Sequence, residues 1–295
     1  MGKIRQTLRR LELDARMRCS GPILRVEFAD ANIGFFAQMN ICLFIARIAE
    51  TYGKSASIVL SSDNYRDPEM GDNWFHYFFV ERDLDAASAR GAAIQLRDQS
   101  ILPRSAARVT GIADANSAFW KAFELRQDIE AAVSEAVTRL GVDKQTLGLH
   151  FRSTDKSTEA TLVPAEVAIA KVRALVAQLK PRNLFVATED ARFLQRIASE
   201  ISEVPVVSLD DSVRSATDAP VHLGGLKQGN YALGRDALLN ALVLSRCGWL
   251  VRTTSFLSAW SVIFDPSVPV FMLNQPHADK LWFPERVILP QATML

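Results

Sequence analysis

Residues 147–159 read LGLHFRSTDKSTE, and this stretch decides the fold class. An apolar run, LGLHF, is followed at once by two cations, two carboxylates and four hydroxyl side chains. In α/β proteins, ligands bind where the carboxyl ends of buried parallel strands open into loops of this kind. The stretch therefore predicts a buried strand over 147–151 that leads directly into a binding loop.

Short apolar runs alternate with segments of helical period on both sides of this stretch. Such alternation is typical of βα units built around a mainly parallel sheet, so we expect an α/β protein. The loop over 208–230 is long and rich in Asp, Ser and Gly, and we expect it to cover a ligand. The expected strands are 23–28, 57–60, 147–151, 184–187, 204–207, 249–251 and 268–272, and the expected helices are 35–52, 117–140, 164–179, 191–201, 234–247 and 255–264.

The chain length predicts more than one domain. Its 295 residues, 48% of them hydrophobic, are enough for two ordinary domains. We expect a first domain over 1–143, a second over 144–275, and a tail over 276–295 that crosses back to the first domain. A ligand would then bind in the crevice formed by the carboxyl ends of the strands.

Charge and composition exclude several classes of protein. The 34 Lys and Arg residues nearly balance the 33 Asp and Glu residues, so the overall charge gives no reason to expect a nucleic-acid partner. The longest uncharged run, residues 31–46, is too short for a membrane-spanning helix. Three scattered cysteines and the absence of an apolar secretion signal lead us to expect a cytoplasmic protein.

Common catalytic motifs are missing from the sequence. It contains no GxGxxG, GxxxxGK[ST], HExxH or GxSxG pattern, which removes sequence support for dehydrogenases, P-loop kinases, zinc proteases and α/β-hydrolases. The functional interpretation therefore depends on the loop after residue 151.

That loop has two competing interpretations. The planar guanidinium of Arg152 suits phosphate oxygens, Lys156 adds a second compact charge, and Asp155 could orient either cation or bind sugar hydroxyls. Glu159 could act as a general base. Alternatively, the loop is a solvated surface whose opposite charges satisfy one another.

Three ordered blocks resemble the fucosyltransferase superfamily, which includes α1,6-fucosyltransferases, nodulation fucosyltransferases and protein O-fucosyltransferases. Residues 150–159, HFRSTDKSTE, resemble the HxRxTDK motif of that group. Residues 184–190, LFVATED, resemble its strand ending in an acidic pair, and residues 237–247 with 253–255 resemble its third block. The resemblance is weaker in the first domain, at residues 34–39 and 63–74.

The resemblance implies a GT-B fold of two facing Rossmann-like domains, in which the second binds a nucleotide sugar and the first the acceptor. It implies an inverting transfer without a metal and with no cofactor beyond the GDP-sugar donor. Arg152 matches the essential phosphate-binding arginine of the family, Lys156 its catalytic lysine, and Glu159 its proposed base. The loop is one residue shorter before Thr158 than in α1,6-fucosyltransferases, which makes the assignment of the base the least direct.

The resemblance also implies a donor-binding set. His150 would contact the guanine or the ribose, and Asp190 and Ser255 would help to hold the donor. The full set of predicted donor-binding residues is His150, Asp155, Thr188, Glu189, Asp190, Asn240 and Ser255. A competing interpretation is that residues 188–190 only cap the helix that follows them.

Two positions depart from the family pattern. Ser153 stands where α1,6-fucosyltransferases carry a second arginine, and Asn240 stands where they carry an aspartate that reads the guanine edge. An aspartate accepts two hydrogen bonds, whereas an asparagine presents one carbonyl and one amide donor. We therefore retain two alternatives to transfer of fucose from GDP-fucose to a glycan hydroxyl: use of another nucleotide sugar, and nucleotide-sugar binding without catalysis.

The first 18 residues are basic and amphipathic. Ile4, Leu8 and Leu11 fall near one face of an expected helix, so this segment could lie on the inner face of an anionic membrane that carries a glycolipid acceptor. The competing interpretation is a helix docked on its own domain.

Overall fold

The computed structural model describes residues 2–30, 33–82, 84, 92–152, 160–210, 212, 214, 230–277 and 293–294. The chain forms two compact units, each described here by itself. The first unit comprises Met1–Gln127 with Asn230–Gly234, and the second comprises Asp128–Gly229 with Arg235–Leu295. The helix that the sequence analysis placed at the end of the first domain thus belongs largely to the second unit.

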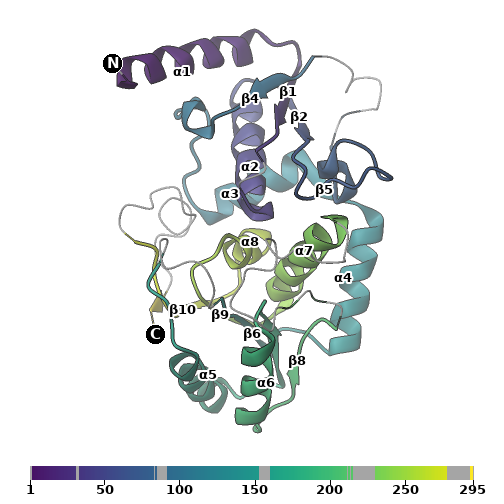
Figure 1. Ribbon diagram of the computed structural model, residues 1–295, viewed down its shortest axis with the longest axis vertical. Helices are drawn as coiled ribbons and strands as arrows, with labels where there is room; N and C mark the ends of the chain where they lie inside the picture. Colours follow the sequence, from purple (N-terminus) through teal and green to yellow (C-terminus); the bar gives the residue numbers. More distant parts are fainter. Residues whose placement is uncertain are drawn as a thin grey trace. The chain divides into compact units, whose positions relative to one another are not determined.

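The first unit is built around a small parallel sheet with strand order β2-β1-β4 (Figure 1). A separate antiparallel pair joins β3 to β5. The elements of this unit are α1 (Gly2–Cys19), β1 (Ile23–Phe28), α2 (Phe35–Thr51), β2 (Ser55–Leu60), η1 (Trp74–Tyr77), β3 (Phe79–Glu81), β4 (Ile94–Leu96), η2 (Gln99–Ile101), α3 (Ile112–Ala122) and β5 (Phe123–Leu125).

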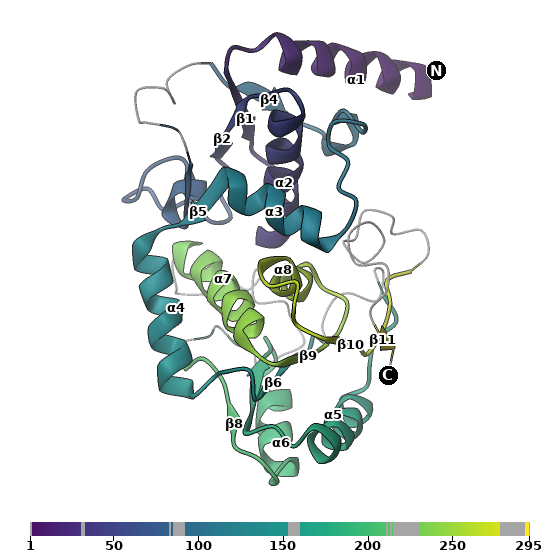
Figure 2. The same ribbon diagram turned by 180° about the vertical axis from the view of Figure 1, so that it is seen from behind.

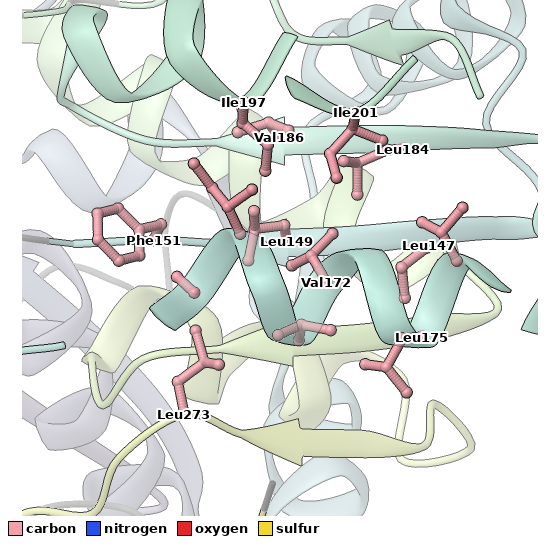
Figure 3. Close-up of a cluster of buried hydrophobic side chains, with 14 of the residues drawn as sticks. Leu147, Leu149, Phe151, Val172, Leu175, Leu184, Val186, Ile197, Ile201 and Leu273 are labelled. Carbon is pink, nitrogen blue, oxygen red and sulfur yellow. The ribbon is translucent and has the colours of Figure 1, made fainter. Parts of the chain in front are cut away.

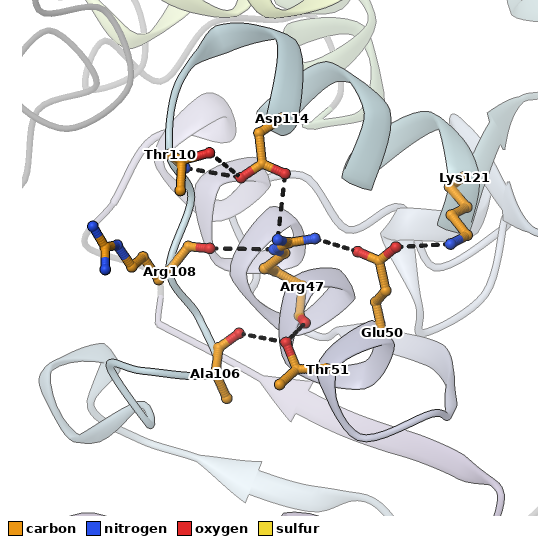
Figure 4. Close-up of polar contacts among 8 residues, drawn as sticks. All are labelled: Arg47, Glu50, Thr51, Ala106, Arg108, Thr110, Asp114 and Lys121. Atoms are coloured by element: carbon orange, nitrogen blue, oxygen red, sulfur yellow. Dashed lines mark hydrogen bonds and ion pairs between the residues drawn. The ribbon is translucent and has the colours of Figure 1, made fainter.

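Polar contacts hold α2 against α3 and the segment before it (Figure 4). The Arg47 guanidinium donates to the carbonyl oxygen of Arg108 at 3.2 Å and lies 3.5 Å from the Asp114 carboxylate. The Lys121 Nζ atom lies 2.7 Å from Glu50 Oε1, and this contact lowers the pKa of the Glu50 carboxyl. These contacts hold α2 in place against α3 within the first unit.

The second unit carries a six-stranded sheet in which every pairing is parallel, with strand order β11-β10-β9-β6-β7-β8. This confirms the expected α/β class with parallel sheets. The elements assigned to it are α4 (Gln127–Leu140), β6 (Thr146–His150), α5 (Ala165–Leu179), β7 (Asn183–Ala187), α6 (Ala191–Glu200), β8 (Val206–Val207), α7 (Asn230–Arg246), β9 (Trp249–Arg252), α8 (Phe256–Phe264), β10 (Val270–Met272) and β11 (Thr293–Met294).

The central strand β6 is buried on both faces. Leu147, Leu149 and Phe151 point into the apolar cluster that α5 and α6 cover (Figure 3). A Cβ added at Gly148 would contact Cys247 and Leu244 on the opposite side, so the α7 helix packs on the other face. Because side chains alternate along a strand, His150 faces the same side as Gly148.

One expectation from the sequence requires correction. The single helix expected over 117–140 is two helices, α3 and α4, separated by β5. Phe123 is fully buried and packs edge-on against Phe75 and Phe119, and β5 pairs with β3, so tertiary contacts override the helical pattern. Near the end of the chain, β11 pairs with β10 of the second sheet. The expected crossing of the tail over 276–295 falls mostly on residues outside the described part of the chain and stays a prediction.

A tight approach at Gly248 sets the start of β9 beside β6. The Gly248 N–H donates to the carbonyl oxygen of Thr146 at 2.9 Å, and a Cβ at this position would overlap the backbone carbonyl of Lys144. We predict that Gly248→Ala lowers the free energy of unfolding by about 3 kcal/mol in urea denaturation, because the backbone must move apart. Gly21→Ala is the matched control, since a Cβ there meets nothing within 4 Å. Equal stability of the two variants would contradict this close approach.

Candidate functional site

Polar side chains gather where three neighbouring strands of the second sheet end. β6 leads into His150 and Arg152, β7 into residues 188–190, and β9 into residues 253–255. The three strands are adjacent in the order β9-β6-β7 and run in the same direction, with His150 in register with Ala187 and Arg252. Their carboxyl ends therefore lie at one edge of the sheet, which is the usual ligand edge of α/β proteins.

The backbone around Arg152 is fixed from both sides. The Phe151 N–H donates to the carbonyl oxygen of Ala187 at 3.1 Å, and the Arg152 N–H donates to Thr253 Oγ1 at 3.1 Å. The Phe151 ring is buried and stacks on Phe193 of α6 with centroids 3.8 Å apart. The packing of Phe151 and these backbone hydrogen bonds thus fix the main chain of Arg152 at the end of β6.

Arg152 faces an acidic partner from the next strand. Its Nη2 lies 3.9 Å from Glu189 Oε1, and the two side chains are 16% and 35% exposed. The other carboxylate oxygen of Glu189, Oε2, is buried and has no hydrogen-bond partner among the residues that the structure describes. A contact of this length is longer than a charge-assisted hydrogen bond of about 2.8 Å.

Asp190 caps the helix that follows β7. Its Oδ1 accepts hydrogen bonds from the N–H groups of Arg192 and Phe193 at 2.9 and 3.1 Å, and Thr188 Oγ1 accepts one from the Asp190 N–H at 3.2 Å. The capping interpretation is therefore correct for Asp190. A capping carboxylate is held in place by these bonds, and the donor-binding role predicted for residues 188–190 stays a prediction.

His150 is neutral at physiological pH. Burial, the Arg252 charge and the Arg152 charge lower its pKa from 6.5 to about 3. Its Nδ1 is buried without a hydrogen-bond partner within the described part of the chain. A neutral imidazole adds no positive charge to the site, and it donates a hydrogen bond from one ring nitrogen and accepts one at the other.

Arg252 is fully buried and supports the turn that opens α8. Its Nε donates to Ser258 Oγ at 2.8 Å and its Nη2 donates to the carbonyl oxygen of Ser255 at 2.8 Å. Within the described residues, Ser255 occupies the N-cap position of α8 without a capping bond from its side chain. Arg252 therefore sets where the amino end of α8, which favours negative charge, meets the strand edge.

Asn240 lies in a separate polar cluster on α7. Its Nδ2 donates to Asp236 Oδ1, to the carbonyl oxygen of Asp236 and to Ser212 Oγ, each at 3.0 Å. The amide nitrogen is thus committed to the protein, so the carbonyl oxygen is the group that this side chain can offer to a ligand. These hydrogen bonds connect Asn240 to Asp236 on the same helix and to Ser212 in the segment after β8.

Several predicted residues lie outside the described part of the chain. Asp155, Lys156 and Glu159 fall in 153–159, together with Ser153, so their roles stay predictions. The described residues contain no group of three or more His, Cys, Asp and Glu side chains that could hold a metal ion.

Two residues that shape the site were not predicted to belong to it. From the sequence pattern, Arg252 is the polar end of a short strand and Thr253 is part of a hydroxyl-rich turn. A charged residue that directly follows the apolar run WLV was the available signal for Arg252, since a strand end at this edge is where ligand-site residues occur.

The comparisons with known proteins define the fold. No family model matches the sequence, and no curated protein matches it. NodZ α-1,6-fucosyltransferase co-crystallised with GDP matches with a TM-score of 0.50 at 15% identity, over 86% of this chain and 95% of that chain. Selenomethionine NodZ from Bradyrhizobium gives 0.51 at 15% identity over the same shares. POFUT1 in complex with GDP gives 0.49 at 8% identity, over 85% of this chain and 98% of that chain.

The chain therefore has the α/β, GT-B-like fold found in NodZ. Its arrangement of a guanidinium, a neutral imidazole and a helix amino end at one sheet edge defines a candidate anion site. At these identities the likeness concerns the fold alone, and the substrate has to be argued from the site.

The buried imidazole makes stability depend on pH. Because the pKa of His150 is lowered from 6.5 to about 3, the unfolded chain binds a proton in this range that the folded chain does not. The contribution of neutral His150 to the free energy of unfolding is therefore complete above pH 6.5 and is lost as the pH falls toward 3. We predict that wild type loses about 2 kcal/mol more than His150→Asn between pH 7.5 and pH 5 in urea denaturation. Parallel pH profiles for the two proteins would contradict a neutral buried imidazole.

Proposed function

We propose that this protein is an inverting, metal-independent glycosyltransferase that transfers fucose from GDP-fucose to a glycan hydroxyl. The observation that carries the proposal is the position of Arg152, whose backbone N–H is bonded to Thr253 Oγ1 where three parallel strands end and whose guanidinium lies 3.9 Å from Glu189. The sequence that continues from it resembles the HxRxTDK motif, and the fold is that of NodZ, whose structure was determined with GDP.

The proposed chemistry uses protein groups in place of a metal. The acceptor oxygen forms a bond to the anomeric carbon while the bond from that carbon to the diphosphate oxygen breaks. The electron pair goes to the diphosphate, whose charge Arg152 and the amino end of α8 stabilise, with Lys156 as a further cation. Glu159 takes the proton of the acceptor hydroxyl. Attack opposite the leaving group inverts the anomeric centre.

The contact between Arg152 and Glu189 prepares the guanidinium for a diphosphate. At 3.9 Å the pair is looser than a charge-assisted hydrogen bond of about 2.8 Å. A diphosphate oxygen at hydrogen-bond distance from Arg152 would make a stronger contact with the guanidinium than Glu189 does.

A second candidate function is nucleotide-sugar binding with a different base or without catalysis. It is favoured by Asn240, whose amide nitrogen is committed to Asp236 and Ser212, so this side chain can accept one hydrogen bond from a base where an aspartate accepts two. Ser153 also removes a cation relative to the family motif. The acceptor, a glycan or glycolipid, is expected on the first unit, where the resemblance is weakest.

Nucleotide binding tests the proposal. We predict that GDP binds more tightly than UDP, CDP or TDP in isothermal titration calorimetry, with the same affinity in the presence of EDTA. Arg152→Ala should bind GDP roughly 10- to 100-fold more weakly, because it loses charged hydrogen bonds to the diphosphate. Arg196→Ala is the matched control: its side chain is 44% exposed, lies on the neighbouring helix α6 and pairs with Glu200, and the affinity of this variant should equal that of wild type.

The other outcomes separate the candidates. Tighter binding of another nucleotide would replace GDP-fucose with another donor. GDP binding without release of GDP from GDP-fucose across a panel of glycan acceptors would favour the binding protein. If no nucleotide binds, or if Arg152→Ala binds as well as wild type, the proposed site is wrong.

A further inference from the structure

Helix α1 docks on its own unit through one face. Leu13 and Met17 are buried, Gln6 Nε2 donates to Ser100 Oγ at 2.9 Å, and Arg10 Nη2 donates to the carbonyl oxygen of Ser100 at 2.8 Å. These four side chains lie on one side of the helix, because their spacing follows the helical period. The expectation of a docked helix is thus correct, but Ile4, Leu8 and Leu11 are not the residues that dock it.

The opposite face of α1 carries an exposed apolar ridge, defined by Ile4, Leu8 and Leu11. These side chains are 71%, 61% and 60% exposed, more than any other large hydrophobic residue in the described part of the chain. Their spacing of four and three residues places them in one row along the helix. In Figures 1 and 2 the N-terminal end of α1 extends past the sheet β2-β1-β4 of its own unit. A row of apolar side chains facing solvent on a well-formed helix indicates a contact surface.

The charge around this ridge is strongly positive. The helix carries Lys3, Arg5, Arg9, Arg10, Arg16 and Arg18 against Glu12 and Asp14. The negative charge of Asp14 is paired within the protein, because its carboxylate lies 3.0 Å from Arg18 and accepts a hydrogen bond from the Tyr52 hydroxyl. Lys3 lies to one side of the ridge, whereas Arg5, Arg9 and Arg16 lie to the other, and all four are exposed.

We propose that α1 binds the surface of an anionic lipid bilayer, with Ile4, Leu8 and Leu11 inserted among the lipids and the flanking cations on the headgroups. An apolar row between cationic flanks is the arrangement that interfacial helices use. The contact is interfacial, because none of the described helices is both long and apolar enough to cross a membrane.

Charge complementarity favours an anionic bilayer over a second copy of the chain as the partner of the ridge. Two α1 helices joined along the ridge would bring the cationic flanks of both copies together, which costs energy at low ionic strength. An anionic lipid surface, by contrast, attracts the cationic side chains on both sides of the ridge. The inference is independent of the nucleotide-sugar proposal, because it rests on the first unit alone.

Vesicle sedimentation with the full chain tests this inference. We expect wild type to pellet with vesicles of phosphatidylcholine and phosphatidylserine, and to stay in the supernatant with phosphatidylcholine alone. The variant Ile4→Gln/Leu8→Gln/Leu11→Gln keeps the helix-forming propensity and the charge of α1, and it should bind the anionic vesicles roughly tenfold or more weakly. Lys3→Gln/Arg5→Gln/Arg9→Gln should weaken binding and reduce its dependence on salt.

Matched controls separate the ridge from general surface hydrophobicity. Leu162→Gln/Val167→Gln changes two exposed apolar residues of the second unit and should pellet like wild type. Circular dichroism and the thermal midpoint should be unchanged in the ridge variant. The inference is overturned if wild type does not pellet, if it pellets equally with neutral vesicles, or if the ridge variant pellets like wild type. Dimerisation that the ridge variant abolishes, without vesicle binding, would assign the face to a second copy.

Discussion

The burial of β6 on both faces is the constraint on which the rest of the second unit depends. Leu147 and Leu149 pack under α5 and α6, and Gly148 gives α7 room to approach from the other side. A strand enclosed in this way can carry polar chemistry only where it ends. His150 and Arg152 stand at that end, and the parallel neighbours β7 and β9 bring their own polar turns to the same edge.

The electrostatics of this edge fit an anion even though the chain as a whole is close to neutral. Arg152 and the amino end of α8 supply positive potential, while burial and the charges of Arg252 and Arg152 lower the pKa of His150 and keep its imidazole uncharged. Arg252 contributes to the site without contacting a ligand, because its bonds to Ser255 and Ser258 fix the first turn of α8. A preorganised set of donors of this kind stabilises a developing charge without having to rearrange.

The sequence predicts the parts of the fold that depend on local pattern. The apolar runs of β6, β7 and β9 and the helical period of α5 and α6 identify the parallel sheet and the edge where the site lies. The division of 117–140 into α3, β5 and α4 is not predictable in this way, because it depends on the long-range pairing of Phe123 with β3 and on aromatic packing against Phe75. The sequence marks Arg252 only as a charged strand end, and its bonds to Ser255 and Ser258 appear only in the structure. One partner of Asn240, Ser212, likewise comes from a distant segment.

The most direct test of the account is a crystal structure of the protein with GDP. We expect the diphosphate within hydrogen-bond distance of the Arg152 guanidinium and beside the amino end of α8, with the nucleoside near His150. A nucleotide bound elsewhere on the chain, with Arg152 still facing Glu189, would contradict it.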